Sequence, residues 1–132
     1  MSQTSLPRDE PFPARSARHE QRLRMLTDLT SADRGRIRAL ANAFSHANEQ
    51  DLLQLRTLYA GQGRTELRLL AHRIKGAAQM TGDTRLGTLC AELGRICSAP
   101  LSDAHALDAC VRHLESALEE FGDSFRQIAQ DA

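Results

Sequence analysis

Residues 107–128 read LDACVRHLESALEEFGDSFRQI and show the clearest helical pattern in the chain. Apolar residues recur along them with a period near 3.6 residues, which is typical of a helix that buries one face. The apolar positions are Leu107, Cys110, Val111, Leu114, Leu118, Phe121, Phe125 and Ile128. The pattern predicts one long helix with a single buried stripe, which other elements must cover.

The same period predicts three further helices earlier in the chain, over about residues 32–60, 65–80 and 84–97. No alternating pattern typical of a strand competes with them. Short connections favour antiparallel neighbours, so the sequence predicts an all-α fold, an antiparallel four-helix bundle.

Local signals place some of the helix boundaries. Gly82 is a suitable C-terminal stop, and Asp83 can cap the helix that follows it. Asn48 interrupts the apolar stripe of the first helix, which allows a break between Asn48 and Asp51.

The N-terminal segment differs from the rest of the chain. Pro7, Pro11 and Pro13 lie among polar and charged residues with few apolar anchors. We therefore expect residues 1–24 to form a flexible, disordered tail or linker and residues 25–132 to form the bundle domain.

Composition narrows the classes of function. The 132 residues include 17 Lys and Arg and 17 Asp and Glu, so the formal net charge is zero. This balance argues against a general nucleic-acid binder, because such binding requires the neutralisation of many phosphates. Without a long apolar run, we expect a cytoplasmic protein with no direct membrane contact. The three cysteines lack metal-ligand spacing, so we expect buried thiols and no metal site.

His72 has the most informative surroundings of the five histidines. On a helix it shares one face with Lys75, Gly76 and Gln79, and Arg68 lies one turn earlier. The apolar positions of this segment lie largely on the other side, so we expect His72 to face water or a partner.

Gly76 is unusual because glycine inside a helix costs about 1 kcal/mol relative to alanine. One interpretation is that it keeps the approach to His72 open, and the other is that it permits close helix packing. A neutral imidazole is a competent nucleophile, and Lys75 could stabilise a developing phosphoryl charge. No nucleotide-binding loop or catalytic triad accompanies them, so we expect a phosphocarrier rather than an enzyme.

Residues 71–93 read AHRIKGAAQMTGDTRLGTLCAEL. The stretch resembles the signature of histidine phosphotransfer (HPt) domains, in which His-x-x-Lys-Gly is followed by Gly, Leu and often Cys at set spacings. Gly82, Leu86, Cys90 and Leu93 occupy those later positions.

The resemblance implies a role for each residue near His72. His72 would be the phosphoacceptor, Lys75 would stabilise the phosphoryl charge, and Gly76 would give access. The partners would be response-regulator receiver domains or a hybrid sensor histidine kinase, and the receiver would supply Mg²⁺ while this chain binds no cofactor. The docking face would comprise Arg68, Leu69, Arg73, Gly76, Gln79 and Met80.

The sequence departs from the family pattern at one position. After Leu93 many relatives carry Glu or Gln, which can orient the histidine ring, whereas this chain has Gly94. Glu92, Gln79 or water would then orient His72, or the ring would be freer.

Two other functions stay open at this point. A binding-only adaptor would use the same face to hold or sequester a receiver domain without transferring phosphate. The dimerisation and phosphoacceptor domain of a histidine kinase would form a stable parallel dimer, whereas we expect a monomer. The chain could also be the C-terminal cytoplasmic part of a membrane-bound hybrid kinase.

Overall fold

The computed structural model describes residues 15–99 and 104–132, which form five α-helices. This confirms the all-helical bundle. The described residues form one helix more than the four predicted, because another helix forms before them. The helices are α1 (Arg15–Leu29), α2 (Arg34–Ala60), α3 (Arg64–Thr81), α4 (Thr84–Ser98) and α5 (Ala104–Asp131).

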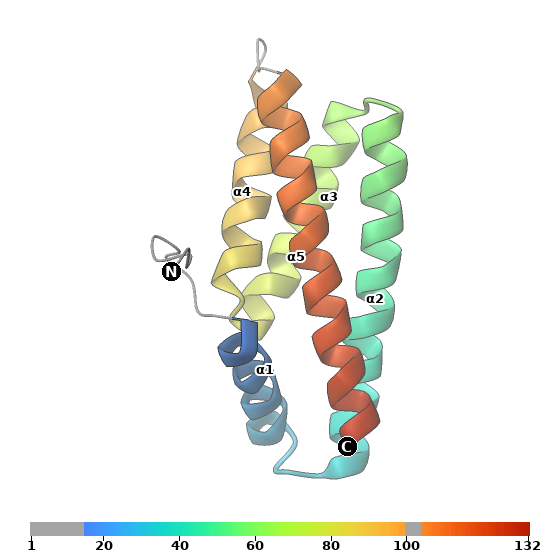
Figure 1. The fold of residues 1–132 in the computed structure, drawn as a ribbon, viewed down its shortest axis with the longest axis vertical. Helices are drawn as coiled ribbons and strands as arrows, with labels where there is room; N and C mark the ends of the chain where they lie inside the picture. The colour runs from blue at the N-terminus through green and yellow to red at the C-terminus, as the bar shows by residue number, and fades with distance from the viewer. Residues whose placement is uncertain (1–14, 100–103) are drawn as a thin grey trace, which may run out of the picture.

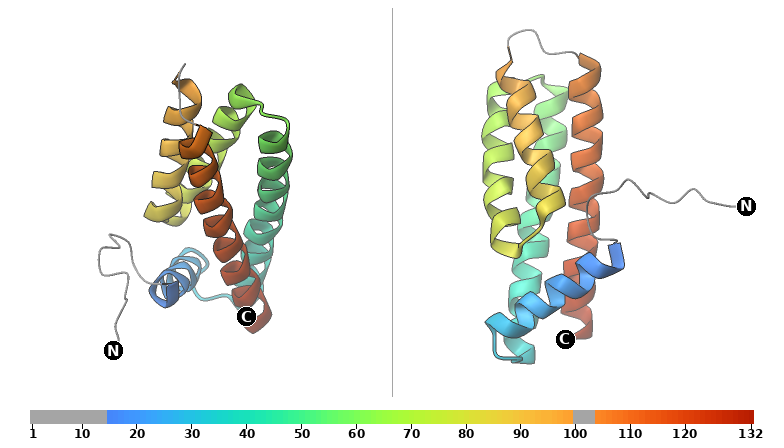
Figure 2. Two further views of the ribbon diagram at one scale, coloured as in Figure 1. Left: turned by 45° about the horizontal axis from the view of Figure 1, so that its top comes forward. Right: turned by 90° about the vertical axis from the view of Figure 1, so that its left-hand side faces the viewer.

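Helices α2 to α5 surround a common core, and each runs opposite to the one before it (Figure 1). Helix α2 packs against α3 and α5, and α4 packs against the same two neighbours. Helices α2 and α5 have 27 and 28 residues, whereas α3 and α4 have 18 and 15. The long pair therefore extends beyond the short pair, and α1 lies across this extension (Figure 2).

The core consists mainly of leucines and small residues, with Phe121 and Phe125 near the α1 end. Burying a leucine fully contributes about 1.5–3 kcal/mol relative to leaving it exposed. The largest fully buried side chains come from all five helices. They are Leu26, Leu55, Leu67, Ile74, Leu86, Cys90, Leu93, Leu114, Leu118, Phe125 and Ile128.

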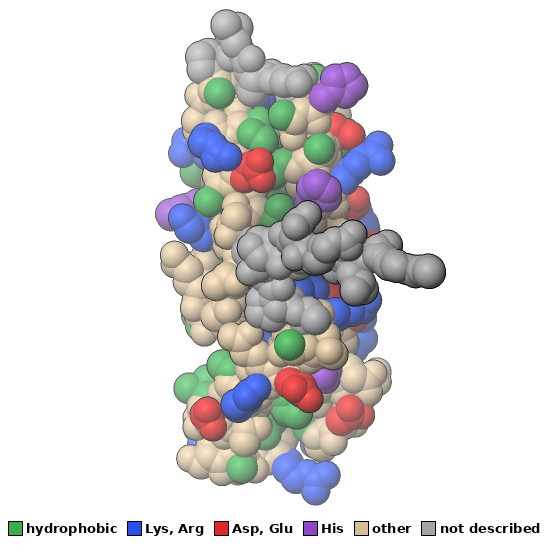
Figure 3. All heavy atoms as spheres, turned by 60° about the vertical axis from the view of Figure 1, so that its left-hand side comes forward, with side chains coloured by type: hydrophobic (Ala, Val, Ile, Leu, Met, Phe, Trp, Pro, Cys, Tyr) green, Lys and Arg blue, Asp and Glu red, His purple; other side chains and the backbone are tan. Residues whose placement is uncertain are grey.

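The surface mixes charges of both signs. On the face shown in Figure 3, basic and acidic side chains of the described residues are scattered among polar and apolar ones. This distribution agrees with the net charge of zero. No helix in the described ranges combines the length and apolar character that crossing a membrane requires.

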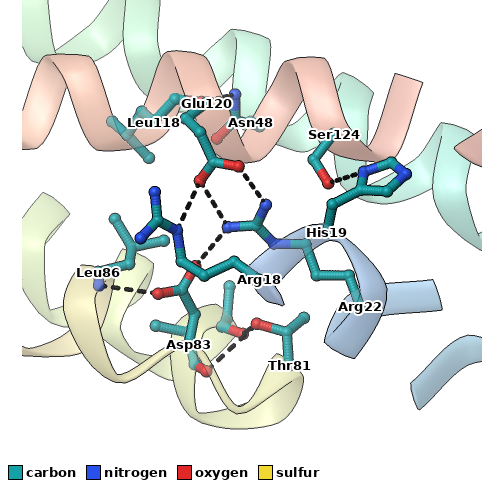
Figure 4. Close-up of polar contacts among 12 residues, drawn as sticks. Arg18, His19, Arg22, Asn48, Thr81, Asp83, Leu86, Leu118, Glu120 and Ser124 are labelled. Carbon is teal, nitrogen blue, oxygen red and sulfur yellow. Dashed lines mark hydrogen bonds and ion pairs between the residues drawn. The ribbon is translucent and has the colours of Figure 1, made fainter. Parts of the chain in front are cut away.

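Helix α1 buries arginine side chains where a bundle helix usually buries leucine. Arg18, Arg22 and Leu26 follow one another at four-residue spacing and are all buried. Both guanidinium groups bind Glu120 of α5, Arg18 at 3.2 Å and Arg22 at 2.6 Å (Figure 4). Arg22 also binds Asp83 at 2.8 Å, so α1 is joined to the turn between α3 and α4.

Aromatic rings complete the surroundings of Arg22. Its guanidinium carbon lies 5.2 Å from the ring centroid of Phe121 and 5.8 Å from that of Phe125. A desolvated cation this close to an aromatic ring gains a favourable cation–π interaction. The side chain therefore has two acidic partners and two aromatic ones.

These contacts correct the predicted tail at residues 15–24. The segment is helical because its buried face pairs with acids of the bundle, and a search for apolar periodicity does not detect such a face. His19, in the same segment, is half-buried and its Nδ1 lies 2.7 Å from Ser124 Oγ. Residues 1–14 of the predicted tail lie outside the described residues.

Helix α2 is continuous, so the break allowed between Asn48 and Asp51 does not occur. Asn48 is buried, and its side-chain nitrogen donates a hydrogen bond to the carbonyl oxygen of Leu118 at 2.8 Å. The amide is therefore a cross-link between α2 and α5, and its polarity is satisfied inside the helix pair.

Gly122 makes this cross-link sterically possible, so Gly122→Ala should destabilise the fold. A Cβ atom at this position would lie 2.5 Å from the Asn48 side-chain nitrogen, which is buried and cannot move into water. The overpacking should lower the free energy of unfolding by about 1–3 kcal/mol despite the better helix propensity of alanine. Urea unfolding followed by circular dichroism measures this loss.

Gly94→Ala is the matched control, because nothing lies within 4 Å of a Cβ placed at Gly94 inside α4. It should raise the free energy of unfolding by up to about 1 kcal/mol. Equal gains in the free energy of unfolding for the two variants would show that the Asn48 side chain can move away from the added methyl group without cost.

Candidate functional site

Helix α3 carries the site and is closed by a well-defined C-terminal motif. Gly82 adopts a left-handed conformation with φ of 72°, which glycine accepts without steric cost. The Asp83 N–H donates to the Ala78 carbonyl at 2.8 Å, and the Gly82 N–H donates to the Gln79 backbone carbonyl at 3.3 Å. This is the hydrogen-bond pattern of a Schellman motif. The predicted stop at Gly82 is confirmed.

Asp83 also begins the next helix, as predicted. Its carboxylate accepts a hydrogen bond from the Leu86 N–H at 3.0 Å, which caps α4. The other carboxylate oxygen binds Arg22. Asp83 therefore connects α1, α3 and α4 at the C-terminal end of α3.

His72 lies in the middle of α3 and faces outward. The side chain is exposed, whereas Leu70, Ala71 and Ile74 beside it are buried in the core. The imidazole has no hydrogen-bond partner among residues 15–99 and 104–132. Both ring nitrogens are thus open to an incoming partner.

Gly76 leaves open space one turn after His72. A Cβ atom built at this position meets no heavy atom within 4 Å. Close helix packing therefore does not explain the glycine. Its role in keeping the approach to the imidazole open stays a prediction.

Gly76→Leu should separate stability from access to His72. The free energy of unfolding should rise by about 0.5–1 kcal/mol, because leucine is a much better helix former and nothing clashes with its Cβ. The rate of phosphoryl transfer from a receiver should fall by about tenfold or more, because the new side chain displaces the partner from the ring. Urea unfolding and a timed transfer assay measure the two effects.

Gly76→Ala provides the graded control, with the same gain in stability and a smaller loss of rate. Unchanged transfer in Gly76→Leu would contradict the role of Gly76 in access.

Lys75 lies on the side of His72 that faces α4. It is half-buried and lines a groove of about 440 Å³ between α3 and α4, together with Gln79 and small residues such as Gly87. Its ammonium forms no ion pair within the described part of the chain. The charge is therefore available to an anion near His72.

The remaining predicted docking residues divide into two kinds. Leu69 and Met80 are exposed at 57% and 71%. Arg68 is exposed on the α4 side, where its positive charge opposes the rise in the Cys97 pKa that burial causes. Gln79 is also exposed.

Arg73 lies on the opposite side of α3. Its guanidinium binds the carboxylate of Asp51 and the side-chain oxygen of Gln54, the latter at 2.9 Å. These contacts with α2 compensate its charge, which the sequence pattern of α3 alone did not reveal.

No side chain from α4 takes over the orientation of His72. A Cβ atom placed at Gly94 would meet no heavy atom within 4 Å. The Glu92 carboxylate instead lies 3.8 Å from the guanidinium of Arg95, one turn along the same helix. Neither Glu92 nor Gln79 bonds the imidazole in the described structure, so water and the freer ring are the alternatives that remain.

The three cysteines are free thiols. Cys90 and Cys110 are buried as predicted, whereas Cys97 is only half-buried. Burial raises the pKa of Cys90 to about 12 and that of Cys110 to about 11. Both thiols are therefore protonated and unreactive near neutral pH. In residues 15–99 and 104–132, no cluster of three His, Cys, Asp or Glu side chains could hold a metal ion.

Comparisons with known proteins add an independent observation. The family model of the Hpt domain matches residues 39–131. No curated protein and no solved structure matches the chain. The matched segment runs from within α2 to the end of α5 and includes His72, Lys75 and Gly76. The chain therefore belongs to the Hpt domain family, whose members are phosphocarriers that interact with receiver domains in phosphorelays.

Proposed function

We propose that this protein relays a phosphoryl group between the phosphorylated Asp of a receiver domain and His72. The observation that carries the proposal is the unobstructed imidazole at the centre of α3 in a member of the Hpt family. The partners would be receiver domains of response regulators or of a hybrid histidine kinase, in the cytoplasm. The protein would act as a monomer.

The transfer step needs little from this chain beyond a positioned nucleophile. A lone pair of the neutral imidazole attacks phosphorus, the new N–P bond forms, and the bond from phosphorus to the aspartyl oxygen breaks. The carboxylate leaves with the electron pair, and the ring releases its other N–H proton to water. Transfer to a second receiver reverses these changes.

Lys75 would stabilise the phosphoryl oxygens during this exchange. An ammonium one turn from His72 lies on the same helix face and has no competing carboxylate in the described residues. The receiver would supply the Mg²⁺ that assists the transfer.

A transfer assay from a panel of phosphorylated receiver domains tests the proposal. The chain should take up phosphate that is labile in acid and stable in alkali, as a phosphoramidate bond is. Measurable binding to receivers without any uptake would overturn the proposal and favour the binding-only adaptor.

A further inference from the structure

The exposed surface of α3 has two chemically different edges on either side of His72. Leu69 and Met80 lie toward α2 and form what we call the apolar edge. Arg68 and Lys75 lie toward α4 and form the basic edge. A protein partner broad enough to cover the imidazole would contact both edges.

The difference in charge between the edges depends on Arg73. This arginine lies beside Leu69 and Met80 and would make that edge basic as well, but Asp51 and Gln54 compensate it. Arg68 and Lys75 have no ion pair among the described residues, and the nearby Glu92 lies against Arg95. The positive charge available to a partner is therefore concentrated on the α4 side.

A receiver domain presents matching chemistry. Its phosphorylation pocket contains the carboxylate of the phosphoacceptor Asp and, when charged, a phosphoryl group with up to two negative charges. Anionic groups are drawn to unpaired cations, and exposed methionine adapts well to an apolar partner surface. An orientation that places the anionic pocket over the basic edge leaves the apolar edge to an apolar surface of the receiver.

We propose that a receiver docks on α3 with its anionic pocket over the basic edge and an apolar patch against Leu69 and Met80. This orientation rests on the proposed function. The two edges have different kinetic roles: Arg68 and Lys75 accelerate association, whereas Leu69 and Met80 slow dissociation.

Matched neutralisations on the two sides of His72 test the orientation. Association and dissociation rates are measured for the full chain with a receiver from the transfer panel, over a series of salt concentrations. Arg68→Gln should reduce the association rate several-fold and weaken its salt dependence. Arg73→Gln removes the same charge from the other edge and should change the association rate by at most about twofold.

A second matched pair tests the apolar edge. Leu69→Ala should accelerate dissociation by about tenfold and leave the salt dependence unchanged. Leu53→Ala truncates a similarly exposed leucine on α2 and should have no effect on either rate.

Phosphorylation of His72 by phosphoramidate, a small donor that needs no docking surface, separates the possible failures. Normal labelling of Arg68→Gln with slow transfer from the receiver supports the orientation. Equal effects of Arg68→Gln and Arg73→Gln on association would overturn it while leaving the transfer function intact. Failure of both donors to label the wild-type chain would overturn the proposed function itself.

Discussion

His72→Gln is expected to reduce phosphate uptake from every receiver to background, while the protein stays folded. The amide of glutamine has no nucleophilic lone pair on nitrogen, so no N–P bond can form. The side chain at position 72 is exposed and makes no hydrogen bond within the described structure, so the substitution removes no stabilising contact. Acid-labile phosphate and helix content by circular dichroism are the two measurements.

His113→Gln is the control, because it replaces another exposed histidine, on α5. It should retain full phosphate uptake. Acid-labile phosphate on the His72→Gln variant would show that another histidine is the acceptor. Unfolding of that variant would show that the imidazole has a structural role.

Glu120→Gln is expected to destabilise the protein by about 3–5 kcal/mol, a large share of the stability of a small domain. The substitution removes the Glu120 carboxylate that both Arg18 and Arg22 bind, and Asp83 is then the one acidic partner of Arg22 among the described residues. Both guanidinium groups are buried, so water cannot replace the lost carboxylate. Urea unfolding at neutral pH, followed by circular dichroism, measures the loss.

The neighbouring Glu119→Gln is the control for this prediction. Glu119 is more than half exposed and pairs with Arg56 at the surface, so its loss should cost about 0.5 kcal/mol or less. Equal losses in the two variants would show that burial of the α1 ion pairs contributes nothing.

The same carboxylate should make the stability depend on pH in acid. Burial alone would raise the pKa of Glu120, but hydrogen bonds and charges from Arg22 and Arg18 outweigh it and hold the pKa below 4.5. A carboxyl with a lowered folded-state pKa contributes stability at neutral pH and loses it as the pH falls through that pKa. The difference in stability between wild type and Glu120→Gln should therefore narrow below pH 4.5.

The site helix could be predicted from sequence because its signals are local. The period of Leu67, Leu70 and Ile74 fixes which face is buried, and therefore that His72 points outward. Gly82 and Asp83 act through hydrogen bonds to residues only three to five positions away. Contacts of this kind can be predicted from a short stretch of sequence.

Contacts between distant segments could not be predicted in this way. The pairing of Arg22 with Glu120 joins residues 98 positions apart. When that pairing is not known, the charged residues of α1 are typical of a solvated tail. Asn48 seemed to weaken its helix because its acceptor, Leu118, lies on another helix. Arg73 seemed free for the same reason, since Asp51 and Gln54 belong to α2.

The sequence did contain one signal of α1, the helix that was not predicted. Glu120 directly precedes Phe121 of the apolar stripe in the last helix, and its buried carboxylate is costly unless a cation is buried with it. The spacing of Arg18, Arg22 and Leu26 offers such a cation on one helix face. The two observations together would have predicted α1.

The buried arginines of α1 also determine how far the protein can be shortened at its N-terminal end. The Hpt match begins at residue 39, after α1 has ended. A fragment trimmed to the match would retain the buried carboxylate of Glu120 and lose Arg18 and Arg22, its two cationic partners. It would also uncover the faces of Phe121 and Phe125 that Arg22 covers. For expression or transplantation into another protein, the unit that keeps these buried charges paired begins at Arg15.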